Sequence, residues 1–138
     1  MFDHCLYFNT TALARQLERE WAAVFLPLQL TSPQAFLLRA ILDHPGLAPR
    51  ELADSLVIAR ATATRALDSL AAKGLIERRA SDSDGREHFI HPTQGALSIH
   101  SALNEASGRV TRRLKMRLGA TTFQRAVGTV REVRFALG

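Results

Sequence analysis

After Gly74 the spacing of apolar residues changes from a helical period to a strand period. The segments before this glycine repeat their apolar residues every three or four positions, which predicts amphipathic helices. Residues 75–79 and 88–91 instead predict two short strands, separated by the turn-rich stretch 80–86. Helical spacing then resumes to the end of the chain. The sequence therefore predicts a mainly helical fold with one small β-hairpin inside it.

Capping signals set the boundaries of the expected helices. Ser32 is an expected N-cap with Pro33 at the first helical position, Pro49 opens a short helix, and Gly74 ends the helix before the hairpin. The expected helices cover about residues 7–25, 32–44, 49–56, 60–73 and 94–118, and a last segment carries Phe123, Val127, Val130 and Leu137. The fifth helix is roughly 35 Å long, as wide as a compact globule of this length. Its length, and the apolar first and last helices beside it, predict burial against a second copy.

Composition excludes several classes of protein. The chain has 138 residues, 46% hydrophobic and 22% charged, which fits one globular domain and argues against disorder. No apolar run reaches the roughly 18 residues of a membrane span, and no signal peptide is recognisable, so we expect a cytoplasmic protein without a membrane partner. A single cysteine excludes an intrachain disulfide and a Cys-rich zinc site. The formal net charge of +5 favours an anionic partner, nucleic acid before membrane.

The predicted fourth helix has a buried stripe and a small polar face. Ala63, Ala66, Leu67 and Leu70 share one side, while threonine, serine and arginine lie on the other. A helix that enters the DNA major groove, about 12 Å wide, needs such short hydrogen-bonding side chains. Three helices with this outer face, followed at once by a hairpin, have the order of a winged helix-turn-helix. The fold class expected is thus mainly α, with a two- or three-stranded wing and long terminal dimerisation helices.

The run 62–78, TATRALDSLAAKGLIER, and the wing 82–86, DSDGR, resemble the MarR family of bacterial transcription regulators. Pro92-Thr93 and the upstream 49–53, PRELA, agree with this resemblance, which covers nearly the whole chain. It implies one domain over residues 1–138, in which 1–30 and 94–138 form dimerisation helices and 31–93 the winged helix-turn-helix. It also implies a homodimeric repressor that binds a pseudo-palindromic operator in double-stranded DNA and responds to a small-molecule effector.

The resemblance places functional residues on the wing and on the predicted fourth helix, which is called the reading helix because it would enter the major groove. Thr62, Thr64 and Arg65 are expected in the major groove and Arg86 in the minor groove, and Asp84 is expected to orient the basic residues of the wing. The complete set of expected DNA contacts is Arg50, Arg60, Thr62, Thr64, Arg65, Ser69, Arg78, Arg79, Asp84 and Arg86. The chain departs from the family at Ala48 and Ala59, where relatives usually offer Ser or Thr caps, and at Gly85, where many have a second arginine.

Other residues leave alternatives open. Cys5 near the start of the first helix is a candidate redox residue of a peroxide-responsive regulator, although an inert cysteine is the plainer interpretation. A winged-helix module that binds protein is the other alternative, because residues 60–91 carry a net charge of only +1. Arg15 and Trp21 are guesses for an effector pocket whose residues the sequence leaves unknown. The C-terminal basic residues are interpreted as a solvated face of a dimerisation helix.

No pattern in the sequence supports catalysis, a cofactor or a metal. His88 and His91 are three apart on a predicted strand, so they point to opposite faces and do not form a metal site. Nucleophile elbows, phosphate-binding glycine loops and paired carboxylates are missing from the chain. The sequence therefore predicts a binding protein and not an enzyme.

Overall fold

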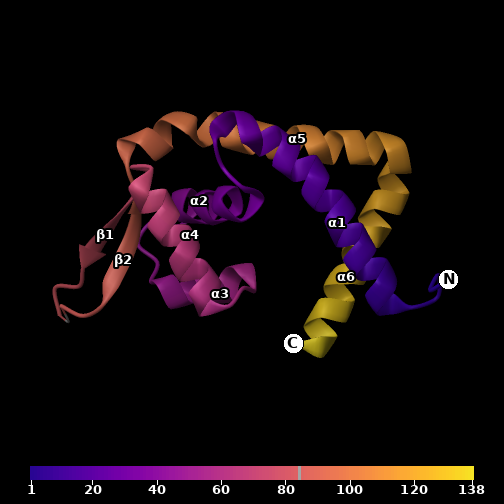
Figure 1. Cartoon of the computed structure of the whole chain (residues 1–138), viewed down its shortest axis with the longest axis horizontal. Coiled ribbons are helices and arrows are strands. Elements are labelled where there is room, and N and C mark those ends of the chain that lie inside the picture. Colours follow the sequence, from indigo (N-terminus) through magenta and orange to yellow (C-terminus); the bar gives the residue numbers. More distant parts are fainter. Residues whose placement is uncertain (84) are drawn as a thin grey trace.

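The computed structural model describes residues 1–83 and 85–138 and is mainly helical (Figure 1). In chain order the elements are α1 (Leu6–Phe25), the 3₁₀ turn η1 (Leu26–Leu28), α2 (Ser32–Asp43), α3 (Pro49–Leu56), α4 (Arg60–Ala72), β1 (Ile76–Ala80), β2 (His88–Pro92), α5 (Gln94–Leu118) and α6 (Ala120–Leu137). Figure 1 shows a winged part of α2, α3, α4 and the hairpin at one end of α5, and an arm of α1 and α6 at the other.

The core lies where α2 meets α4, α5 and the hairpin. Leu37, Leu38 and Ile41 of α2 are fully buried, as are Leu67 of α4 and Leu103 of α5. These positions follow the helical spacing of the sequence, so each helix turns its apolar stripe inward. The remaining large, fully buried side chains are Phe25, Leu52, Leu70, Ile90 and Val110.

Helix α2 begins one residue earlier than the sequence suggested. Its N-cap is Thr31, whose hydroxyl accepts from the Gln34 backbone N–H at 3.3 Å, and Gln34 Oε1 accepts from the Thr31 N–H at 3.1 Å. This reciprocal capping box satisfies two backbone donors. Ser32, expected as the cap, is instead the first helical residue and is buried.

The wing is a two-stranded antiparallel hairpin in which Ile76 pairs with Pro92 and Arg78 with Ile90. Beyond the two strands, Leu47 adds an isolated bridge to Ile90, so a third segment touches the sheet without forming a strand. Ile76 and Ile90 are buried, and they fix the hairpin to the core. The distal part of the wing is closed at its base by the Ser81 N–H, which donates to the Glu87 carbonyl at 2.8 Å.

Helix α5 joins the winged part to the arm. Ala96, Leu103, Ala106 and Val110 are buried along one side of it, and the chain then turns at Gly119 into α6. At the centre of α5, Ser107 Oγ accepts from Trp21 Nε1 of α1 at 3.0 Å and from Arg39 Nη1 of α2 at 3.1 Å. One hydroxyl thus connects three helices, α1 of the arm, α2 of the winged part and α5.

Within the described ranges, no single helix has the length and apolarity to cross a membrane. The bent pair Leu6–Leu28 and Ser32–Asp43 meets that test only when the two are taken together, across a 69° bend.

Candidate nucleic-acid interface

Helix α4 exposes the short polar face that the sequence predicts. Thr64 and Arg65 are exposed and Thr62 is half-buried, while Ala63 and Leu67 are buried behind them. Arg65 Nη2 lies 3.4 Å from Thr62 Oγ1, so the guanidinium rests along the helix surface. Thr64 Oγ1 donates back to the Arg60 carbonyl at 3.0 Å, and its lone pairs still face solvent.

The turn that leads into α4 holds a strained residue. Val57, the C-cap of α3, has φ 55° and ψ 48°, a left-handed conformation that β-branched side chains rarely adopt. This conformation ends α3 and directs the chain toward the start of α4 at Arg60. Ala59 offers no side-chain cap, as expected from the sequence. Ala48, the N-cap of α3, also lacks a side-chain cap, but this is partly offset because Glu51 Oε2 accepts from the Ala48 N–H at 2.8 Å.

The wing is fixed to the end of α4 by two features. Gly74 takes φ +72° and forms a Schellman ending, with Gly74 N–H on the Ala71 carbonyl and Leu75 N–H on the Leu70 carbonyl. Thr93, which follows β2, donates from Oγ1 to the Gly74 carbonyl at 2.6 Å. The reading helix and both strands of the wing therefore meet at one hydrogen-bonded corner.

Two arginines of β1 are paired with carboxylates. Arg78 Nη2 lies 2.7 Å from Asp68 Oδ1 of α4, which links the wing to the reading helix. Arg79 binds Glu77 Oε1 through Nε at 3.0 Å and through Nη2 at 2.7 Å. These pairs are on the surface, so each stabilises the fold by only about 0–1 kcal/mol and can be exchanged for a phosphate contact.

Arg50, at the start of α3, reaches the base of the wing. Its Nη1 lies 2.7 Å from Glu87 Oε1, across 37 residues of sequence. The Glu87 carboxylate raises the pKa of the Arg50 guanidinium, first through the hydrogen bond and then through its charge, and Glu51 and Asp54 add smaller effects. Arg50 therefore sits in an acidic surrounding, and its pairing with Glu87 was not predicted from the sequence.

The other expected contacts differ in their exposure. Arg60 and Arg86 are exposed and Ser69 is half-buried. Asp84 lies outside the described residues. The structure thus brings α4, the start of α3 and the arginines of the wing together at one end of the molecule (Figure 1). A helix with short polar side chains, flanked by arginines on a hairpin, suits a major groove with its neighbouring phosphates.

Comparison with known proteins agrees with this geometry. A sequence profile of the MarR family matches residues 28–87. The HTH-type transcriptional regulator MgrA of Staphylococcus aureus is 30% identical over 106 residues, which cover 76% of this chain and 72% of MgrA. The chain belongs to the MarR family of DNA-binding transcriptional regulators. MarR proteins are regulators and not enzymes, in agreement with the sequence.

Two further similarities are to a second transcriptional regulator and to a solved structure. The organic hydroperoxide resistance transcriptional regulator of Bacillus subtilis is 28% identical over 109 residues, 75% of this chain and 74% of that protein. The solved structure of the transcriptional repressor CouR bound to a 23-mer DNA duplex has a TM-score of 0.89 at 23% identity, covering 96% of this chain and 94% of CouR. The winged-helix fold expected from the resemblance is confirmed.

The acidic partners of the arginines are the residues that sequence reasoning missed. Asp68, Glu77 and Glu87 each hold an arginine expected to contact DNA. Glu77 is two residues from its partner Arg79. Side chains two residues apart on a strand lie on the same face, so this pair was predictable from the sequence. Asp68 and Glu87 pair across the fold, and no local pattern identifies such partners.

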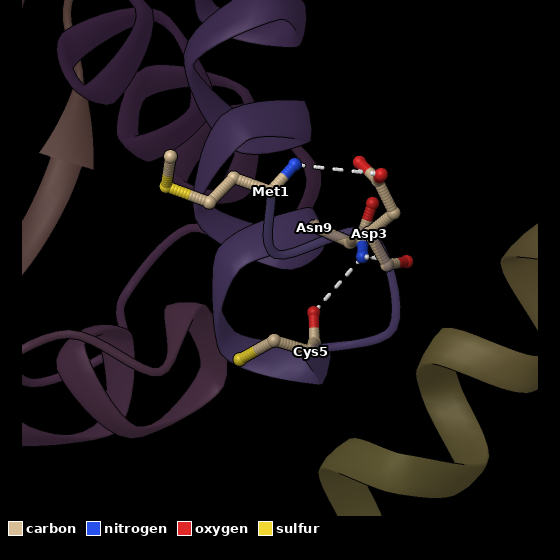
Figure 2. A network of polar contacts seen from close by, with 4 residues as sticks. All are labelled: Met1, Asp3, Cys5 and Asn9. Atoms are coloured by element: carbon tan, nitrogen blue, oxygen red, sulfur yellow. Dashed lines mark hydrogen bonds and ion pairs between the residues drawn. The ribbon is translucent and has the colours of Figure 1, made fainter.

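Cys5, the candidate redox residue, is exposed at the N-cap of α1. Figure 2 shows its side chain pointing away from the polar contacts of Asp3 and Asn9. Asn9 Nδ2 donates to the Cys5 and Asp3 carbonyls, both at 2.9 Å, and thereby closes the first turn of α1. Among the described residues the thiol has no hydrogen bond or ion pair of its own.

The guessed effector residues differ in their surroundings. Trp21 lines a hollow of about 430 Å³ between α1 and α2, whereas Arg15 is exposed outside its lining. The lining consists of Ala14, Leu17, Glu18, Trp21, Ser32, Pro33 and Phe36. Ser32 Oγ is buried there and has no hydrogen-bond partner among the residues that the structure describes.

The basic residues of the C-terminal region are largely engaged within the arm. Arg113 and Arg117 face Glu20 of α1 at 3.3 and 3.8 Å, and Arg112 binds Glu105 at 2.6 Å. These contacts suit the solvated helix face that the sequence favours. Across the described ranges, no three His, Cys, Asp or Glu residues form a group that could hold a metal ion.

Proposed function

We propose that this MarR-family regulator is a sequence-specific repressor that acts as a homodimer on a pseudo-palindromic operator. The observation that carries the proposal is the face of α4 formed by the half-buried Thr62 and the exposed Thr64 and Arg65, which the Thr93–Gly74 hydrogen bond holds beside the wing. Hydroxyls on such a face reach phosphates or base edges, and an arginine can bind guanine through two donors. Two copies related by a two-fold axis would bind half-sites about one helical turn apart.

Exposed apolar residues on the arm support the homodimer. On α6, Phe135 and Leu137 are 68% and 80% exposed, and at the other terminus Leu6 and Tyr7 are 63% and 78% exposed. Within the described chain no residue of α6 is fully buried, although the helix carries a repeating apolar face. Contact with the same helices of a second copy would bury these side chains and make the arm a stable unit.

A small-molecule effector is expected in the hollow between α1 and α2. This hollow lies where the arm meets the winged part, and Trp21 in its wall is hydrogen-bonded to Ser107 of α5. Leu17, Trp21 and Phe36 supply apolar surface, while the buried Ser32 hydroxyl has no hydrogen-bond partner within the described part of the chain. A ligand that favours one arrangement of α1 against α2 would change the spacing of the two reading heads.

The proposal is tested by selecting DNA. Purified protein is mixed with a pool of random-sequence duplexes, bound DNA is amplified over several rounds, and the enriched sequence is assayed by fluorescence anisotropy. We expect a pseudo-palindrome. Arg65→Ala should weaken binding to it by about 1–3 kcal/mol, roughly 5- to 150-fold. Arg19→Ala, on the exposed face of α1, is the matched control and should bind as the unaltered chain does.

If no sequence is enriched and binding is independent of salt, the repressor proposal is wrong. The winged-helix module that binds protein then becomes the better description. Enrichment of a single half-site without symmetry would retain DNA recognition and contradict the homodimer on its operator.

A thiol-responsive regulator is a second candidate. The exposure of Cys5 and the similarity to the hydroperoxide resistance regulator of Bacillus subtilis favour it. In this version, oxidation of Cys5 takes the place of effector binding and releases DNA. Treatment with cumene hydroperoxide should release the selected duplex from the unaltered chain but not from Cys5→Ser. Equal release from both proteins would exclude Cys5 as the sensor.

A further inference from the structure

Arg50, one of the expected DNA contacts, forms an ion pair with Glu87. Its two members come from different elements, the first turn of α3 and the residue just before β2. The 2.7 Å contact between Arg50 Nη1 and Glu87 Oε1 is a charge-assisted hydrogen bond. The Arg50 side chain is 55% exposed, so its remaining donors are open to solvent.

Glu87 is held in place from both of its ends. Its carbonyl accepts from the Ser81 N–H at 2.8 Å, which closes the base of the wing loop, and its carboxylate binds Arg50. The nearby acids cannot replace it, because Glu51 is committed to the Ala48 N–H at 2.8 Å and Asp54 acts on Arg50 only through its charge. Among the described residues, Glu87 is therefore the carboxylate that binds Arg50 directly in the free protein.

We propose that Glu87 sets the DNA affinity of this chain by occupying Arg50 as an intramolecular substitute for a DNA phosphate. The inference rests on the proposed DNA-binding function. A carboxylate and a phosphate oxygen present the same hydrogen-bonding group to a guanidinium, so the two compete for Arg50. Binding of DNA then breaks the pair, proceeds without Arg50, or uses the remaining donors of Arg50, and in each case Glu87 leaves a negative charge near the phosphates.

Counterion release gives the size of the effect. Each phosphate that an arginine neutralises steepens the dependence of log K on log salt by about 0.9. If removal of the Glu87 carboxylate makes Arg50 fully available, and if the gain vanishes at 1 M salt, this slope raises affinity by up to about 15-fold at 50 mM salt and by up to about fourfold at 200 mM. A carboxylate that served only to support the wing would produce the opposite sign, because its loss would weaken binding.

The experiment measures binding of Glu87→Gln to two fluorescent duplexes, the selected sequence and a scrambled sequence of the same composition, at 50, 100 and 200 mM salt. The matched control is Glu105→Gln, which also removes a carboxylate from a close arginine pair, at 2.6 Å from Arg112 on α5. Both variants carry the same net charge. We expect Glu87→Gln to bind both duplexes more tightly and with a steeper salt dependence than either the unaltered chain or the control.

The double variant Arg50→Gln, Glu87→Gln identifies the arginine responsible, since the gain should disappear when Arg50 is absent. Glu87→Ser removes the same carboxylate, so the conclusion does not depend on the folding of one variant, and circular dichroism verifies each. Glu87→Asp should restore part of the normal affinity.

Three results would overturn the inference. Glu87→Gln could bind like Glu105→Gln, it could bind more weakly than the unaltered chain, or its gain could persist in the double variant. If the unaltered chain binds neither duplex at any salt concentration, the proposed function fails and this inference fails with it.

Discussion

Replacement of Ser107 by alanine tests the hydrogen-bonded centre of the molecule. The Ser107 hydroxyl is buried and accepts from both Trp21 Nε1 and Arg39 Nη1. Without it the indole N–H is left unpaired in a part-buried position, which costs about 1–3 kcal/mol. Arg39 loses less, because it is partly exposed and keeps its 2.9 Å bond from Nε to Asn104.

The expected loss of stability is about 2 kcal/mol. The Trp21 donor and the Arg39 donor together account for about 2–3 kcal/mol, and the better helix propensity of alanine returns about 0.5 kcal/mol. For a chain of this length, a loss of that size lowers the melting temperature by roughly 5–10 °C. Ser101→Ala is the control, since Ser101 is exposed on the same helix and makes the same change in propensity.

The assay is urea denaturation at one fixed protein concentration, because an oligomer's stability depends on concentration. Trp21 is the only tryptophan of the chain, so its fluorescence reports directly on the altered contact. Circular dichroism of the same samples follows the loss of helix. If Ser107→Ala and Ser101→Ala differ by less than about 0.5 kcal/mol, the three-helix connection contributes no stability and the reasoning is refuted.

Three further changes test other parts of the fold by thermal denaturation. Val57→Gly should raise stability by about 1 kcal/mol because it relieves a left-handed β-branched residue with φ 55°, and an unchanged or lower melting temperature would contradict that strain. Thr93→Val should cost about 1–2 kcal/mol through the lost bond to the Gly74 carbonyl and the lost N-cap of α5, where Thr93 Oγ1 accepts from the Ala96 N–H at 3.3 Å, and it should also weaken DNA binding; a stable variant with normal binding would show that this corner does not position the wing. Leu67→Ala should cost about 2–5 kcal/mol because the side chain is fully buried, whereas a loss below 1 kcal/mol would place it outside the core.

Local patterns in the sequence determine most of the fold. The apolar spacing on α4, the Gly74 ending and the change to strand period each depend on residues close in the chain, so they were predictable. The predicted N-cap of α2 was wrong by one residue. Thr31 and Ser32 are both good caps, and the capping box with the Gln34 side chain decides for Thr31.

The candidate site was predictable only in part. The exposure of Thr64 and Arg65 follows from helix geometry. The ion pair between Arg50 and Glu87 spans 37 residues, and the Trp21–Ser107 bond spans 86. Such contacts depend on how α3, the wing, α1 and α5 pack in three dimensions, and no spacing rule within one element reports on that.

The 25 residues of α5 form one helix, about 37 Å long, from the winged part to the arm. A change of its angle at one end is therefore converted into a displacement at the other. A tilt of about 5° at one end displaces the other by about 3 Å, close to the rise of one base pair. A small rearrangement in the arm therefore produces a displacement at the winged part that is large enough to move α4 from one base step to the next.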